Sequence, residues 1–148
     1  MLTPADFDTA VLHESAADAE ATWQWGPYFT PQEFACRGTG KVLVVPRHMN
    51  MVFALREMVG FGMTSNSSYR DPDYDASVGG AGVHPFGIAD DWRVSGARAH
   101  ALLLGAFKLG FTGIGIRQKG PHEKRFIHLD NLNPSITDKH PRPWVWSY

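Results

Sequence analysis

The 148-residue sequence contains only one cysteine, Cys36, and no long apolar run. A single cysteine excludes an internal disulfide and a cysteine zinc cluster, so any metal site has to use histidine, aspartate or glutamate. No apolar stretch approaches the roughly 20 residues that a membrane helix needs, so we expect no membrane insertion. The formal net charge of -1 leaves no excess of basic residues, so we expect no nucleic-acid partner.

The start of the sequence, MLTPADFDTAVLHESAADAEATWQW, is acidic and lacks the charged beginning and apolar stretch of a signal peptide. We therefore expect cytoplasmic synthesis without a signal peptide. Internal repeats, low-complexity tracts and dividing linkers are also absent. The length is that of one domain and is enough to bury about two-thirds of the surface of the unfolded chain.

Apolar periodicity predicts two amphipathic helices, over residues 46–59 and 96–109. Each is followed by a glycine, the residue that most often ends a helix. In the second helix we expect Leu103, Leu104 and Phe107 to be buried.

Strand signals occur at several places along the chain, and a short capped helical turn is predicted at residues 30–34. Helices and strands follow one another without a repeated βαβ rhythm. This order favours an α+β domain, a small, largely antiparallel sheet with helices packed on one face. We expect the aromatic tail RPWVWSY to cover an edge of the core, with a wall of a functional site as the alternative. The predicted strands lie within residues 62–70, 87–94, 112–118 and 125–131.

Strand parity places several polar side chains on one face of the sheet. In RFIHLDN, His128 and Asp130 share a face, while the apolar side chains between them point toward the core. In GIADDWRV, Asp91 shares a face with the small Ala89, which leaves room beside the carboxylate. Asp90 points the other way; we expect it to face solvent or to cap, and it rivals Asp91 if the register shifts by one residue.

A candidate metal site follows from this parity. His84 lies in the turn before the strand that carries Asp91, and Gly87 lets the chain fold back. His84, Asp91 and His128 can form a three-ligand zinc site with an open position for water, the pattern of catalytic zinc. The spacing is also compatible with structural roles. His84 is then a turn histidine, His128 a half-buried histidine within the sheet, and Asp91 the partner of an arginine.

The segments SSYRDPDYDASVGGAGVHPFGIADDW and RFIHLD, with the Trp-rich end, closely resemble the zinc D,D-carboxypeptidase and L-alanyl-D-glutamate endopeptidase family. The nearest branch is the small C-terminal peptidase domain of phage and bacterial cell-wall enzymes. The family pattern is Ser-Gly-Tyr-Arg, then Ser-x-His-x-x-Gly-x-Ala-x-Asp, then a late histidine. Here Ser68 stands at the first glycine and Gly82 at the second serine. The matching positions are Ser67, Tyr69, Arg70, His84, Gly87, Ala89, Asp91, His128 and Asp130.

The resemblance implies a Hedgehog/D,D-peptidase-like fold over residues 29–148, preceded by an extension of unknown role over residues 1–28. It implies Zn2+ as the cofactor, with His84, Asp91 and His128 as its ligands.

Arg70 and a carboxylate complete the site that the resemblance implies. Arg70 would hold the substrate carbonyl or its developing oxyanion; without the family it is interpreted as an exposed turn residue. Many relatives carry Glu or Asp three residues before the last histidine, where this sequence has Arg125, which cannot take a proton from water at neutral pH. We expect Asp130 as the general base first, because it shares the strand face of His128, and Glu123 second. A carboxylate that orients a ligand or Arg70 is the alternative role for Asp130.

The resemblance implies a zinc-dependent peptidase that cuts the peptidoglycan stem peptide, at either a D-Ala-D-Ala or an L-Ala-D-Glu bond. It implies action on the cell wall and, without a signal peptide, a phage lysis or virion-associated enzyme, with virion proteins as further partners. Two alternatives stay open. One is a structural or wall-binding module of the same fold that retains the metal without turnover; the other is a zinc amidohydrolase or peptidase with a different substrate, since fold does not fix function.

Overall fold

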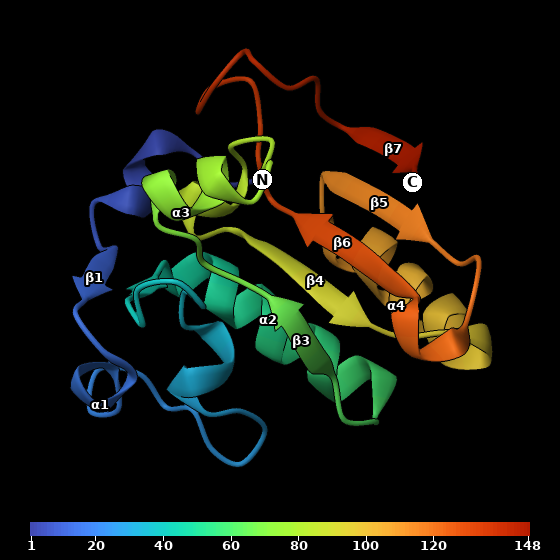
Figure 1. The fold of residues 1–148 in the computed structure, drawn as a ribbon, viewed down its shortest axis with the longest axis horizontal. Coiled ribbons are helices and arrows are strands. Elements are labelled where there is room, and N and C mark those ends of the chain that lie inside the picture. Colours follow the sequence, from blue (N-terminus) through green and yellow to red (C-terminus); the bar gives the residue numbers. More distant parts are fainter.

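A five-stranded sheet lies at the centre of the structure, a computed structural model that describes residues 1–148 (Figure 1). In spatial order its strands are β3 (Thr64–Ser67), β4 (Ala89–Arg93), β6 (Phe126–Asp130), β5 (Gly113–Arg117) and β7 (Trp144–Ser147). Neighbouring strands run antiparallel, except that β5 and β7 are parallel. The four strands predicted from the sequence are all present in this sheet, and β7 is added to them by the aromatic tail.

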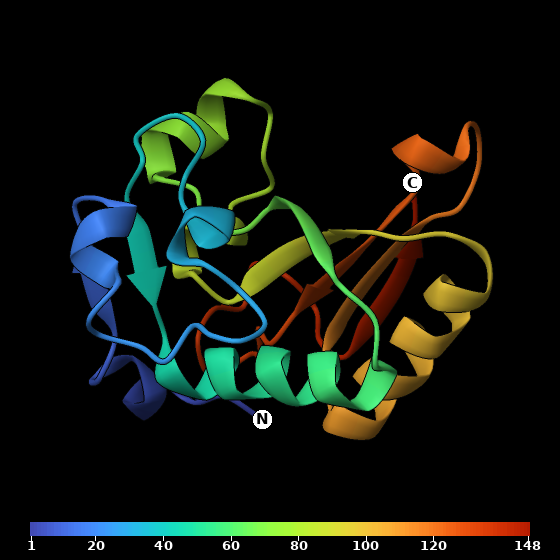
Figure 2. The ribbon, with the colours of Figure 1, turned by 90° about the horizontal axis from the view of Figure 1, so that it is seen from below.

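Two long helices, α2 (Pro46–Val59) and α4 (Gly96–Leu109), lie on one face of the sheet (Figure 2). Both occupy the predicted ranges, and each ends at a glycine with positive φ, 72° at Gly60 and 82° at Gly110. Apolar side chains from both helices and from the sheet form the main core. The predicted α+β class, a largely antiparallel sheet with helices on one face, is confirmed.

The buried side of α4 differs from the predicted one. Leu104 and Phe107 are 50% and 59% exposed, and Leu103 is only partly buried. The side that faces α2 instead carries small residues, and a Cβ at Gly105 would lie 2.6 Å from Leu55 Cδ1. Because apolar residues surround much of α4, periodicity does not distinguish its sides, and the side with small residues allows the closest approach of α2.

Residues 1–28 pack against the rest of the chain. Trp25 is 3% exposed and belongs to the main core. The predicted boundary between residues 28 and 29 stays a prediction. The elements of this part are η1 (Pro4–Phe7), β1 (Val11–His13) and α1 (Ala16–Ala19), and β1 pairs antiparallel with β2 (Val42–Val44).

Short helical segments make most of the remaining connections. The predicted capped turn is η2 (Pro31–Phe34), where the Glu33 carboxylate accepts the Thr30 N–H at 2.7 Å. None of the helices is both long enough and apolar enough to cross a membrane. The other short helices are α3 (Pro72–Ser77), η3 (His84–Phe86) and η4 (His122–Lys124).

The two faces of the sheet differ in polarity, as strand parity predicts. Trp92, Ile127 and Leu129 point toward the helices and belong to the main core. Asp90 shares this face and is fully buried, so the expectation that it faces solvent or caps is wrong. Its Oδ2 lies 2.9 Å from Nε2 of His48 on α2, a partner 42 residues away that no local pattern indicates.

Candidate metal centre

One row of residues crosses the polar face of the sheet. Asp91 on β4 is paired with His128 on β6, and His128 is paired with Gly115 on β5. Ser67 and Trp146 continue the row on the two outer strands. Directly paired residues place their Cβ atoms about 4.5–5.5 Å apart on the same face, so the strand register brings the side chains of Asp91 and His128 together.

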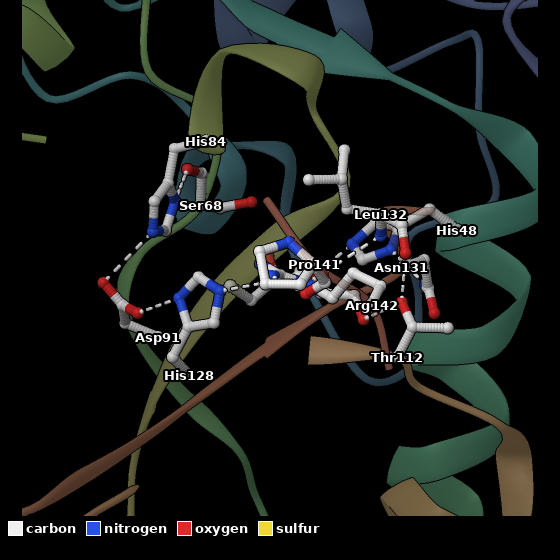
Figure 3. A network of polar contacts seen from close by, with 12 residues as sticks. His48, Ser68, His84, Asp91, Thr112, His128, Asn131, Leu132, Pro141 and Arg142 are labelled. Atoms are coloured by element: carbon white, nitrogen blue, oxygen red, sulfur yellow. Dashed lines mark hydrogen bonds and ion pairs between the residues drawn. The ribbon is translucent and has the colours of Figure 1, made fainter. Parts of the chain in front are cut away.

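His84 joins this row from the short helix η3. Gly87 ends η3 with a φ of 69°, and a Cβ there would lie 2.7 Å from Leu43 Cδ2. Nδ1 of His84 lies 2.6 Å from the Ser68 carbonyl oxygen, which can only accept, so Nδ1 carries the proton. Nε2, the other nitrogen of the ring, faces Asp91, whose Oδ2 is 3.4 Å away (Figure 3).

His128 lies between two carboxylates. Its Nδ1 is 2.9 Å from Asp91 Oδ1, and its Nε2 is 2.9 Å from Asp130 Oδ2. Burial lowers the pKa of His128, but the hydrogen bonds to Asp130 and Asp91 outweigh it and raise the pKa to about 9. In the metal-free protein the ring is therefore a cation at neutral pH and donates to both carboxylates.

The pKa values of the two carboxylates shift downward. Burial raises the pKa of Asp91, but hydrogen bonds from His128 and His84 outweigh it and hold the pKa well below its ordinary value. Burial also raises the pKa of Asp130, yet hydrogen bonds from His128 and Arg142 bring it to about 2. Both carboxylates are therefore ionised at neutral pH, the state in which a carboxylate binds a metal ion.

The geometry of His84, Asp91 and His128 fits a zinc ion. One candidate ligand atom from each residue lies within 4.8 Å of the other two. Zinc bonds of about 2.0–2.2 Å in a tetrahedral arrangement place ligand atoms roughly 3.4 Å apart. Asp91 Oδ1 lies 2.9 Å from His128 Nδ1, and Asp91 Oδ2 lies 3.4 Å from His84 Nε2. Both separations are close to this value. Three protein ligands leave the fourth position of the zinc ion open. To bind a metal through Nδ1, His128 has to lose the proton on that nitrogen.

We predict that the metal-free protein loses stability as the pH rises above neutrality. The pKa of His128 is about 9 in the folded state, against an ordinary value of 6.5. Its stabilising contribution is therefore complete below about pH 6.5 and lost by about pH 9. The loss corresponds to about 3 kcal/mol of the free energy of unfolding. Urea unfolding with a chelator present, at about pH 6 and about pH 9, measures it.

At acid pH, protonation of Asp91 and Asp130 lowers the stability of the metal-free protein. Because the pKa values of Asp91 and Asp130 are lowered by folding, their contribution is complete above about pH 4 and is lost as the pH falls toward about 2. The metal-free protein should thus be most stable between about pH 4 and 6.5. His128→Gln should remove the loss on the alkaline side, and an equal loss in that variant would contradict the role of His128.

Arg70 points at the same site and is held in one orientation. Its Nε donates to Ser67 Oγ at 2.8 Å, and its Nη1 to Asp75 Oδ1 at 3.0 Å. Its Nη2 is 3.3 Å from Asp91 Oδ2. Asp75, on α3, is 2% exposed and also accepts the Gly82 N–H at 3.0 Å. The guanidinium therefore lies beside the candidate ligands, and Asp75 holds it there.

Asp130 accepts from Nε2 of His128, the ring nitrogen that does not contact Asp91. Arg142 donates to both of its oxygens, from Nε to Oδ1 at 2.9 Å and from Nη2 to Oδ2 at 2.7 Å. Asp130 is fully buried, and a Cβ at Gly113 would lie 2.1 Å from its Oδ2. Glycine at this position of β5 therefore leaves the room that the carboxylate occupies.

The structure does not bring Glu123 to the candidate ligands. Glu123 lies in η4 and lines a separate cleft together with Arg93 and Arg98. Arg125, at the position where relatives carry a carboxylate, donates from Nε to the Gly120 carbonyl at 2.9 Å. Of the two carboxylates expected as bases, only Asp130 therefore contacts a candidate ligand.

A cavity of about 490 Å³ opens over the candidate metal centre and is lined by His84, Asp91, His128 and Arg70. Its lining also includes Phe126, His140, Arg142, Trp144, Trp146 and Tyr148. The aromatic tail thus forms a wall of the site. From the sequence this was the alternative, and the first expectation was that the tail covers an edge of the core.

Two residues that hold the site carry no recognisable signal in the sequence. Asp75 is one of three aspartates after Arg70, with Asp71 and Asp73, and only the fold of α3 shows which of them the arginine meets. Arg142 lies 12 residues beyond Asp130, across a loop whose path the sequence does not indicate.

Comparison with known protein families gives one finding for this chain. A family model described as Peptidase M15 matches residues 27–130, more than half of the sequence. The matched segment contains Arg70 and the three candidate ligands and ends at Asp130, so β7 lies outside it. No curated protein matches the chain.

Proposed function

Because the chain belongs to the peptidase M15 family, we propose that it is a zinc-dependent peptidase that hydrolyses a peptide bond in the peptidoglycan stem peptide. M15 peptidases are zinc enzymes. The observation that carries the proposal is the group of His84, Asp91 and His128 in the cavity. This group supplies the three ligands that a catalytic zinc ion needs.

In this proposal zinc is held by Nε2 of His84, a carboxylate oxygen of Asp91 and Nδ1 of His128. Bound zinc lowers the pKa of a water molecule to about 7 and polarises a carbonyl group. The Ser68 carbonyl and the Asp130 carboxylate accept hydrogen bonds from the other nitrogens of the two rings and so fix their orientation. Outer partners of this kind raise the affinity of a histidine for its metal.

We assign to Arg70 the stabilisation of the negative charge that develops on the substrate carbonyl oxygen. Its side chain is 18% exposed and lines the cavity. Its contacts with Ser67 and Asp75 hold the guanidinium in place before the charge develops, so little reorganisation is needed.

The contacts of Asp130 support an orienting role rather than that of general base. Both of its oxygens accept from Arg142, and one also accepts from His128. Apart from the ligands and arginines, the side chains in the cavity that can carry a proton are His140 and Tyr148. These two are the groups available to pass a proton to the leaving amine.

The substrate and the biological setting are part of the proposal. A cavity of about 490 Å³ suits a short peptide segment, and both the D-Ala-D-Ala and the L-Ala-D-Glu bond of the stem remain candidates. The resemblance to small phage wall-degrading enzymes supports a phage lysis or virion-associated protein as the setting.

Zinc content and stem-peptide cleavage, measured on the same purified protein, test the proposal. Mass spectrometry of fragments released from purified peptidoglycan distinguishes the bonds: free D-alanine indicates D-Ala-D-Ala cleavage, and a new amino terminus on D-glutamate indicates the other. A chelator should stop the release, and added zinc should restore it.

Two results would contradict the proposal in different ways. Bound zinc without any released fragment would favour a wall-binding module of the same fold, an alternative that the arginine at position 125 already supports. A protein that binds no zinc would contradict the ligand set itself.

A further inference from the structure

The strand β7 lies outside the segment that matches the family, yet it borders the metal centre. Trp146 on β7 is paired with Gly115 on β5, and Gly115 is paired with His128 on β6. Paired residues present their side chains on the same face. The three positions therefore form the end of the row that contains the candidate ligands.

Gly115 leaves a gap in this row, and the side chain of Trp146 fills it. A Cβ at Gly115 would lie 2.6 Å from Cε2 of the indole, which is too close for a real contact. The φ of Gly115 is not positive, so the backbone does not require glycine here. Glycine at this position leaves free the space above β5 that the indole occupies. Through this space the Trp146 side chain reaches from β7 across β5 to β6.

The indole contacts His128 and is itself held by Arg142. The ring centroids of Trp146 and His128 are 5.2 Å apart, with an angle of 50° between the planes. The guanidinium carbon of Arg142 lies 5.3 Å from the indole centroid. The same guanidinium binds Asp130, which accepts from Nε2 of His128. Trp146 and Asp130 are thus linked through one arginine.

We propose that Trp146, seated over Gly115, is a positioning residue that holds His128 for metal binding. The inference rests on the proposed zinc site, in which His128 is a ligand. The hydrogen bonds of His128 act in the plane of its ring, whereas the indole opposes tilting out of that plane. The indole lies against His128, which is 4% exposed, and water that reached the bond between His128 and Asp130 would compete for it.

Trp146→Ala should lower the affinity for zinc about tenfold, within the range found for outer partners of metal ligands. Competition with a chromophoric chelator measures the affinity, and the visible spectrum of the cobalt-substituted protein should change because the ligand geometry changes. Trp146→Phe should restore most of the affinity. Val145→Ala is the matched control: Val145 lies on the opposite face of β7, is 52% exposed, and should leave zinc affinity unchanged.

Gly115→Ala tests the same contact from the other side. Its methyl group should displace the indole and lower zinc affinity by a similar factor. In a protein that already carries Trp146→Ala, the same change should have no further effect. Additive losses in the double variant would show that the two residues act separately and would overturn the inference.

The outcomes distinguish this inference from the proposed function. If the wild type binds zinc and Trp146→Ala binds it equally well, the positioning role is wrong and the proposed function stands. If the wild type binds no zinc, both fail. Urea unfolding of the metal-free variants separates a general loss of stability from a specific loss of affinity, and Trp146→Leu takes the place of the alanine variant if that variant does not fold.

Discussion

The His84→Ala protein should contain no stoichiometric zinc and should release no fragments from peptidoglycan. Without Nε2 of His84, one imidazole and one carboxylate remain, fewer than the three protein ligands of catalytic zinc. The loss of zinc affinity should exceed the roughly 10–100-fold cost of removing an outer partner. Without the metal, the pKa of water is not lowered, so water is not activated at neutral pH.

Zinc content after dialysis and fragment release by mass spectrometry measure this result. His100→Ala is the matched control, because His100 is exposed on α4 and does not line the cavity. The fold should persist in both variants, since the alanine at position 84 removes only the contacts with the Ser68 carbonyl and with Asp91 Oδ2, at a cost of about 1 kcal/mol each. Wild-type zinc content in His84→Ala would remove His84 from the ligand set.

Arg70→Lys should lower kcat about 10²–10³-fold, the usual cost of losing one group that stabilises an oxyanion. Lysine keeps the charge, but a single ammonium group cannot reproduce the directed contacts of the guanidinium with Ser67, Asp75 and Asp91. KM should change less than kcat, because the stabilised charge develops only in the transition state. Zinc content at saturating zinc should match the wild type, since the three ligands are intact.

Steady-state kinetics on a stem-peptide substrate, together with zinc content, measure the effect of Arg70→Lys. Arg47→Lys is the control, because Arg47 is on α2, 53% exposed in its side chain, and pairs only with Asp6 at 3.7 Å. An unchanged kcat in Arg70→Lys would exclude Arg70 from the reaction. A parallel loss of zinc would instead show that Arg70 acts through Asp91.

Local signals in the sequence predicted the main elements well. The helices at residues 46–59 and 96–109 depend on periodicity and on the glycines after them, and both properties belong to neighbouring residues. The buried side of the second helix was predicted incorrectly, because that side depends on how closely another helix approaches. β7 was missed because its pairing with β5 is not visible in the tail alone.

The candidate site, too, could be predicted from the sequence only in part. Strand parity correctly placed His128 and Asp130 on one face and Ile127 and Leu129 on the other. It could not show that His48 binds Asp90 beneath the sheet, because these residues are 42 positions apart.

The sequence alone was enough to establish the α+β class, the positions of the long helices, and which faces of the strands carry polar side chains. Each of these depends on residues a few positions apart. The partners of those side chains depend on the folded chain: Asp91 meets His128 across 37 residues, and Asp130 meets Arg142 through the path of a loop. Register and packing set these contacts, so the roles of Asp75, Arg142 and Trp146 become visible only when distant strands and loops come together.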